Sequence, residues 1–160
     1  MEQTYAIELK NITKRFGKIV ANDGINLKVK RGEILSLLGE NGSGKTTLMN
    51  MISGIYFPDE GRILVDGKAV SIRSPKDSFD LGIGMIHQHF KLIDVMTAAE
   101  NIILGLKGNA VLDMKKVHKD IQELVDRYGF DLDPAQKVYT MSVSQKQTVE
   151  IVKMLYRGAN

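Results

Sequence analysis

The sequence contains no cysteine among its 160 residues. Disulfide bonds, thiolate chemistry and cysteine-ligated zinc are therefore excluded, in agreement with a reducing compartment. It also lacks any apolar run approaching the roughly 18 residues that a transmembrane helix needs. The N-terminus carries Glu2 and Glu8, where a signal peptide would have a basic and then an apolar region. We expect a chain that stays in the cytoplasm.

Long basic runs interleaved with aromatic residues, which would indicate a nucleic-acid groove, are missing as well. The formal net charge of +3 and the pI near 9.0 come from scattered lysines and arginines. Internal repeats and low-complexity linkers are also absent. The remaining composition is ordinary for a globular protein, with 43% hydrophobic and 26% charged residues. We therefore expect one domain with a real core and no nucleic-acid partner.

The most informative stretch is Gly39–Thr46, the phosphate loop, which fits G-x-x-x-x-G-K-[ST] at every fixed position. The apolar run Ile34–Leu38 leads into it as an expected buried strand, and Lys45–Ile52 leaves it as an expected helix that Gly54 can terminate. Glycines let the backbone approach an anion, so that N–H groups and the helix N-terminus point at phosphate oxygens. An ordinary glycine-rich turn is the alternative, and the strand-loop-helix order argues against it.

A nucleoside triphosphate and Mg²⁺ are the ligands that this loop predicts. Lys45 would reach the β- and γ-phosphates, and the Thr46 hydroxyl would be a Mg²⁺ ligand. Further contacts to the nucleotide are expected from other residues of the loop and its helix, namely Asn41, Gly42, Ser43, Gly44 and Thr47.

Period-two alternation predicts β-structure on both sides of the phosphate loop. Tyr5–Leu9 alternates as an edge strand would, and residues 25–29 alternate again after a turn signal at 22–24, which predicts an antiparallel start. After the loop helix, Arg62–Asp66 predicts a short strand and Asp66-Gly67 a hairpin. Phe16 is expected in a polar loop, where by itself it is most simply a partly buried packing aromatic.

The next segment combines a short helix with a second buried strand. Ser74 and Pro75 supply the N-cap and first position of a helix that Gly82 ends. Ile83–His87 reads as a buried strand with Gln88 at its C-terminal end. Ligand-contacting groups gather at such ends in open α/β sheets.

Helical signals dominate from Thr97 onward. Thr97–Glu100 is a capping box that opens a helix through about Leu106. Asp113 caps another helix, which ends at Gly129. Its apolar face reads as core: Met114, Val117, Ile121, Leu124, Val125 and Tyr128.

The last part of the sequence alternates between turn-like and helical character. Met141–Gln147 is polar and turn-like, and Thr148–Arg157 resumes helical spacing. The predicted organisation is a mixed α/β nucleotide-binding body over about residues 1–90 and a helical lobe over about residues 91–160.

Taken in order, these motifs resemble the ATP-binding-cassette (ABC) ATPases. Stretches such as ITKRFGKIVANDGINL, GENGSGKTTLMNMISG, GIGMIHQHFKL and VEIVKMLYRGAN look most like the ATP-binding subunits of bacterial sugar and nucleoside importers. The resemblance covers essentially the whole chain. It implies an α/β fold of the P-loop NTPase, ABC type, with an antiparallel β subdomain and a helical subdomain, here as the N-terminal portion of one cassette.

The resemblance assigns roles to residues outside the phosphate loop. Phe16 would stack on adenine, with Val20 and Ala21 as apolar contacts; stacking alone would not make the site strictly ATP-specific. Gln88 would ligate Mg²⁺ or its water through a hard carbonyl oxygen and report nucleotide state to a membrane partner. His87 and His89 flank it and raise a transition-metal site as an alternative, which lacks an evident third ligand.

The family's signature loop is typically L-S-G-G-Q, and here the run is Met141–Gln145. The resemblance implies that Ser142, Ser144 and Gln145 close on ATP bound by an opposing subunit. Ser144 replaces a glycine and so loses positive-φ freedom. The alternative is that this run is merely a helix N-cap.

Family members continue into a hydrophobic strand ending in Asp-Glu and then a switch histidine, whereas this sequence ends at Asn160. Phosphoryl transfer depends on positioning water and neutralising charge, so we expect these 160 residues alone to bind ATP without turnover. We also expect marginal stability, or pairing of open strand edges with another chain.

The resemblance implies an ATP-binding and hydrolysing subunit that energises an importer, with Lys45 and Gln88 as its catalytic residues here. Its partners would be transmembrane permease subunits, a second cassette and, indirectly, an extracytoplasmic solute-binding protein, at the cytoplasmic face of the membrane. A nucleotide-binding module without turnover is the main alternative. A soluble cassette ATPase in DNA maintenance or translation is another. A GTPase or kinase fits less well, because no Asn-Lys-x-Asp guanine reader is present.

Overall fold

The computed structural model describes residues 5–86, 90–106 and 113–158. The chain divides into two compact units, residues 1–83 and 84–160. Each unit has its own cluster of buried apolar side chains. Among the described residues, no helix has both the length and the apolar composition needed to cross a membrane.

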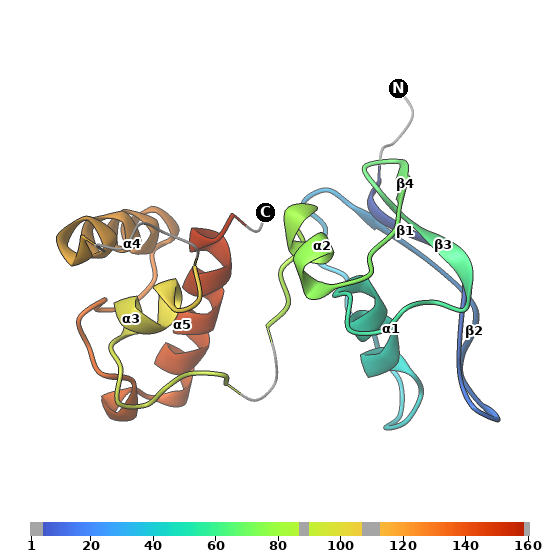
Figure 1. The fold of residues 1–160 in the computed structure, drawn as a ribbon, viewed down its shortest axis with the longest axis horizontal. Coiled ribbons are helices and arrows are strands. Elements are labelled where there is room, and N and C mark those ends of the chain that lie inside the picture. The colour runs from blue at the N-terminus through green and yellow to red at the C-terminus, as the bar shows by residue number, and fades with distance from the viewer. Residues whose placement is uncertain (1–4, 87–89, 107–112, 159–160) are drawn as a thin grey trace. The chain divides into compact units, whose positions relative to one another are not determined.

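The first unit is built on a four-stranded antiparallel sheet in the order β2-β1-β3-β4 (Figure 1). Its strands are β1 (Tyr5–Phe16), β2 (Ile19–Lys30), β3 (Glu60–Val65) and β4 (Lys68–Val70). The predicted antiparallel start is confirmed. The prediction of an edge strand at Tyr5–Leu9 is wrong, because β3 pairs with the far side of β1, with Leu9 opposite Ile63. The alternation of apolar and polar residues indicates that one face of the strand is buried, but it does not indicate whether one or both backbone edges are paired.

The turns of the sheet differ from the sequence prediction at one place and agree at another. The signal at residues 22–24 makes no turn; it lies inside β2, where the pairing with β1 is irregular. The hairpin instead turns at Gly17-Lys18, so that Phe16 ends β1 and faces Ile19. The hairpin at Asp66-Gly67 is confirmed, with φ of 49° and 76°, the left-handed pair that a type I′ turn requires.

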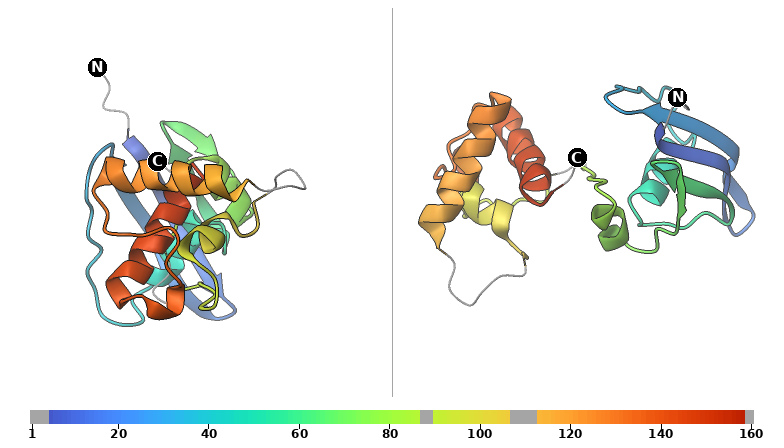
Figure 2. Two further views of the ribbon diagram at one scale, coloured as in Figure 1. Left: turned by 90° about the vertical axis from the view of Figure 1, so that its left-hand side faces the viewer. Right: turned by 90° about the horizontal axis from the view of Figure 1, so that it is seen from above.

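Two helices accompany the sheet. Helix α1 (Lys45–Ile52) lies against one sheet face, as Figures 1 and 2 show, and its buried residues join the strand core. That core consists of Leu9, Ile12, Leu48, Met51, Ile52, Ile63 and Ile72. Helix α2 (Pro75–Asp80) begins after Ser74, whose side chain accepts from the Asp77 N–H, as predicted. Its buried Ser78 hydroxyl donates to the Ile52 carbonyl at 2.9 Å and so ties α2 to the end of α1.

The apolar run before the phosphate loop is not a strand. Ile34–Leu38 forms no ladder, and Ile34 and Leu38 are 97% and 93% exposed. The prediction of a buried strand there is wrong for this chain, because the described residues supply no strand to pair with it. Residues 83–86 likewise form no strand, and His87, the end of that predicted strand, lies outside the described residues.

An exposed apolar segment with unpaired backbone groups favours association between copies. We expect the double substitution Ile34→Lys with Leu38→Lys to reduce concentration-dependent self-association, measured by light scattering. A control pair, Val95→Lys with Val143→Lys, changes residues of 73% and 72% exposure outside this segment. An equal reduction in both variants would contradict a specific role for the segment.

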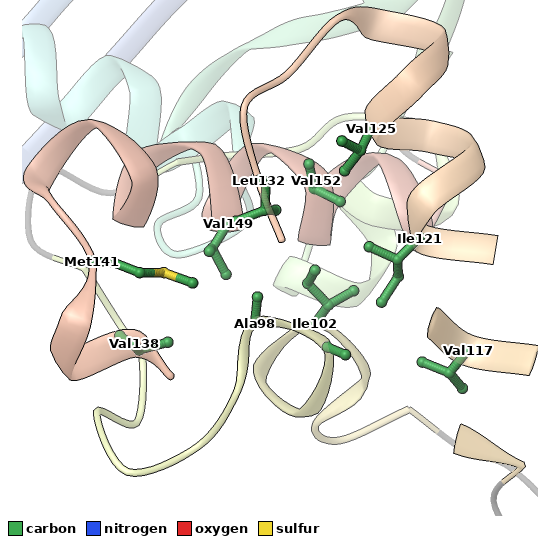
Figure 3. Packing of buried hydrophobic residues seen from close by; sticks show 11 residues of the cluster. Ala98, Ile102, Val117, Ile121, Val125, Leu132, Val138, Met141, Val149 and Val152 are labelled. Carbon is green, nitrogen blue, oxygen red and sulfur yellow. The ribbon is translucent and has the colours of Figure 1, made fainter. Parts of the chain in front are cut away.

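The second unit is helical, with α3 (Ala98–Ile103), α4 (Met114–Tyr128), the short 3₁₀ turn η1 (Val138–Thr140) and α5 (Val143–Tyr156). Figure 3 shows their apolar residues converging on one core. The core comprises Ala98, Ala99, Ile102, Val117, Ile121, Val125, Leu132, Val138, Met141, Val149 and Val152.

The helix caps of this unit agree with the sequence, and two boundaries do not. The Thr97–Glu100 capping box is present, but α3 ends at Ile103 instead of about Leu106. The Asp113 carboxylate accepts from the first turn of α4, and Gly129 ends it in the left-handed region, as predicted. Helix α5 begins at Val143, five residues before the predicted start at Thr148, because Ser142 caps it.

Candidate functional site

The phosphate loop folds into a tight turn that opens α1. The Ser43 N–H donates to the Glu40 carbonyl at 3.2 Å, and Gly42 and Gly44 take φ of 85° and 84°. Gly44 is the N-cap of α1, and no side chain caps the helix. The first-turn N–H groups therefore have no side-chain acceptor, and they carry the positive end of the helix dipole. This is the arrangement in which a helix N-terminus binds a phosphate group.

The ammonium group of Lys45 lies within the loop. It donates to the carbonyls of Gly39 and Glu40 at 2.6 and 2.7 Å and to the Ser43 hydroxyl at 3.2 Å. These acceptors are exposed and neutral, so a phosphate oxygen can compete for the ammonium with a stronger, charge-assisted hydrogen bond. The loop thus holds one cation beside the uncapped helix N-terminus.

Strand β2 lies in close contact with the phosphate loop at Gly44. A Cβ atom on Gly44 would overlap the Ala21 carbonyl oxygen and lie 2.8 Å from Asn22 Nδ2. The Asn22 amide donates to the Gly44 carbonyl at 3.3 Å. Gly42, at nearly the same φ, has nothing within 4 Å of the equivalent position. At Gly44, both the positive φ and the close contact with β2 require a glycine. At Gly42, only the positive φ does.

The β1–β2 hairpin, which contacts the loop through β2, also carries Phe16 at the end of β1. The Phe16 ring is 42% exposed and meets the Tyr56 ring edge-on at a centroid distance of 5.2 Å. Lys14 Nζ also lies over the Phe16 ring, 5.4 Å from its centroid. The packing interpretation of Phe16 is thus correct in part, and part of the residue remains exposed. Val20 is half exposed on the same hairpin, and the carbonyl of Ala21 lies at Gly44. Phe16, Val20 and Ala21 therefore lie on one β1–β2 hairpin, which meets the phosphate loop at Ala21.

Acidic side chains after α1 hold the end of this hairpin. The Asp59 carboxylate accepts from the Arg15 N–H at 2.6 Å and from Lys14 Nζ at 3.0 Å. These bonds, that of the Arg15 N–H first, lower the pKa of Asp59 below its ordinary value. Glu60 pairs with the Arg15 guanidinium at 2.6 Å and raises the pKa of Arg15. The segment immediately before Phe16 is thereby tied to residues 59 and 60.

Sequence reasoning missed Tyr56 and Asn22. Neither belongs to a recognisable motif, and Asn22 sat inside a stretch that signalled a turn. Its burial, with 6% of its surface exposed, is the feature that marks it, and burial depends on the packing of β2 against α1. The one signal in the sequence that could have indicated Asn22 is its polarity at a position where the strand pattern otherwise places apolar residues.

A phosphate group fits the loop by its donor set, the Lys45 ammonium and the uncapped first-turn N–H groups of α1. For Mg²⁺ the described residues hold no group of three or more His, Asp or Glu side chains. Thr46, in the first turn of α1, supplies one hydroxyl oxygen. Mg²⁺ commonly combines one or two protein oxygens with phosphate oxygens and waters, which such a site allows. The predicted second ligand, Gln88, and the flanking His87 and His89 lie outside the described residues.

The signature-like run belongs to the helical unit. The Ser142 hydroxyl accepts from the Gln145 N–H at 3.2 Å, and Gln145 Oε1 accepts from the Ser142 N–H at 3.0 Å. Ser142 therefore caps α5, which the helix N-cap alternative expects and a signature role does not exclude. Ser144 lies in the first turn of α5 without positive φ, so the expected loss of positive-φ freedom does not apply. The Ser144 side chain and Val143 are exposed at the start of α5.

Comparison with known proteins gives consistent results. The family profile described as ABC transporter matches residues 22–160. The chain is 52% identical, over 98% of its length, to the guanosine import ATP-binding protein NupO of Bacillus subtilis, of which it covers 31%. It is 51% identical, over 100% of its length, to the nucleoside import ATP-binding protein NupA of Lactococcus lactis subsp. cremoris, of which it covers 32%. Other relatives are import ATP-binding proteins named for sugars. The chain spans about a third of the length of these curated relatives.

Among solved structures, the ADP conformation of an ATP-binding cassette from an ABC transporter matches with a TM-score of 0.84 and 26% identity. The match covers 97% of this chain and 66% of that one. The sheet with its phosphate-loop helix, and the helical unit, therefore each have a counterpart in a solved ATP-binding cassette.

Proposed function

This chain belongs to the ABC transporter family, and on that premise we propose that it is the ATP-binding part of a subunit that energises import of a nucleoside. The observation that carries the proposal is the ammonium of Lys45 held inside a loop that opens onto an uncapped helix N-terminus. One cation and a set of N–H donors in this order suit the β- and γ-phosphates of ATP.

The choice of a nucleoside over a sugar as the imported solute is supported by the relatives. The two matches with identities of 52% and 51% carry the names of a guanosine and a nucleoside importer. The matches named for glucose and ribose are 43% and 40% identical. Import of a sugar is the second candidate, because the relatives named for sugars also match this chain but at lower sequence identity.

In this proposal Phe16 stacks on adenine while Ala21 and Val20 give apolar contacts. Lys45, Asn41, Gly42, Ser43 and Gly44 hold the phosphates, with Thr46 and Thr47 at the helix start. Thr46 and Gln88 are the proposed Mg²⁺ ligands. Bound Mg²⁺ would neutralise phosphate charge. The chain's own groups orient the triphosphate and donate hydrogen bonds to it.

We further propose that the polypeptide of residues 1–160, by itself, binds ATP but releases phosphate only at background rate. Lys45 and the loop neutralise charge, but nothing in the described site positions an attacking water. Ser142, Ser144 and Gln145 are proposed to act on ATP held by a second cassette, and transmembrane permease subunits are the proposed partners at the cytoplasmic face. An extracytoplasmic solute-binding protein would take part indirectly.

Substitution Phe16→Ala tests the proposed ATP site. Stacking on an aromatic side chain contributes about 1–3 kcal/mol per base. We expect Phe16→Ala to weaken ATP binding about tenfold and to leave the affinity for inorganic triphosphate unchanged, because that ligand has no base. Calorimetric titration measures both affinities. Tyr139→Ala, another exposed aromatic residue, serves as the control and should change neither. An unchanged ATP affinity in Phe16→Ala would contradict the stacking role.

A further inference from the structure

Asn22 combines three properties that ordinary packing does not explain. It is buried, with 6% of its surface exposed, within a strand whose other inward positions are apolar. Its amide donates to the Gly44 carbonyl at 3.3 Å, across 22 residues of sequence. Its side-chain carbonyl oxygen has no hydrogen-bond partner in the described part of the chain. A buried unsatisfied oxygen costs about 1–3 kcal/mol, so an apolar residue would suit the fold better.

The position of Asn22 links the two halves of the proposed ATP site. It lies on β2 three residues after Ile19, which faces Phe16 across the hairpin. Its bond ends on the residue that caps α1 in the phosphate loop. This side-chain hydrogen bond and the adjacent contact of Ala21 with Gly44 are thus direct links between the hairpin that carries Phe16 and the loop that would hold the phosphates.

We propose that Asn22 is a positioning residue that holds the Phe16 hairpin in register with the phosphate loop, so that one ligand can engage both. The inference rests on the proposed function and goes beyond it by assigning a role to a residue outside every motif. The Gly44 carbonyl also accepts from the Leu48 N–H at 2.9 Å, which is the first helical bond of α1. Loss of the Asn22 amide therefore removes one hydrogen bond between β2 and the loop and leaves the first helical bond of α1 in place.

The test compares ligands with and without a base. For Asn22→Ala we expect ATP affinity to fall about three- to tenfold, the range of one neutral hydrogen bond, and inorganic triphosphate affinity to stay within about twofold. Calorimetry on the full chain measures both. Asn22→Leu keeps the branched shape of the side chain but donates nothing, and it should lose as much ATP affinity as Asn22→Ala. Full ATP affinity in Asn22→Leu would overturn the proposal, because packing would then suffice.

A double-mutant cycle separates positioning from a general defect. If Asn22 acts through Phe16, Asn22→Ala lowers ATP affinity no further in the Phe16→Ala background. Additive losses, or an equal fall in triphosphate affinity, would overturn the inference. The proposed function fails separately, if Phe16→Ala alone leaves ATP affinity unchanged.

Discussion

Substitution Lys45→Ala is expected to weaken Mg·ATP binding by about 10- to 100-fold, the range of one or two charge-assisted hydrogen bonds. The Lys45 ammonium has only exposed carbonyls and one hydroxyl as partners in the loop. Water can replace the ammonium at these groups, so the fold should tolerate the substitution. The loss therefore falls on the ligand, and calorimetric titration with and without Mg²⁺ measures it.

The matched control for Lys45→Ala is Lys68→Ala. Lys68 is an exposed lysine of β4 in the same unit, away from the phosphate loop in sequence. Its removal lowers the net charge equally and should leave ATP affinity within about twofold. Equal losses in the two variants would mean that long-range charge, instead of a contact to phosphate, determines binding. An unchanged affinity in Lys45→Ala would remove Lys45 from the site.

The second large effect is expected from Gly44→Ala, compared with Gly42→Ala. Both residues have φ near 85°, where a non-glycine residue costs about 1–2 kcal/mol. Only at Gly44 does the new methyl group overlap the Ala21 carbonyl, which adds about 1–3 kcal/mol as overpacking does. We expect Gly44→Ala to lower the free energy of unfolding by at least about 1 kcal/mol more than Gly42→Ala, measured by urea denaturation.

The comparison of the two glycines also tests the contact between β2 and the loop. If Gly44→Ala and Gly42→Ala are equally destabilising, the hairpin does not press on the loop as the structure has it. Failure of Gly44→Ala to fold at all, with Gly42→Ala folded, agrees with the close contact. The pair is informative because conformation is matched and only the neighbour differs.

Much of the fold could be predicted from signals within short stretches of the sequence. The side chains of Ser74, Thr97 and Asp113 accept from N–H groups two or three residues further on, so each cap can be predicted from a short stretch of sequence. The Asp66-Gly67 turn is equally local. The phosphate loop was predicted because its glycines and Lys45 stand at fixed spacing and interact with one another.

Features that depend on distant partners were not predicted correctly. Ile34–Leu38 has the composition of a buried strand, but a strand is buried only where neighbours cover it, and the described residues supply none. The edge position of β1 was wrong because β3, some fifty residues later, pairs with it. Asn22 was overlooked because its partner, Gly44, lies in another element. Each of these three errors concerns a contact between residues that are distant in the sequence.

The central claim is that Gly39–Thr46 holds the phosphates of ATP while the Phe16 hairpin meets its base. Amide-resolved NMR of the full chain during titration with Mg·ATP and with inorganic triphosphate tests it most directly. The account predicts that both ligands shift the amides of residues 39–46, and that only ATP also shifts those of residues 16–21. Shifts confined to other parts of the chain, or none in the loop at saturating ligand, would contradict it.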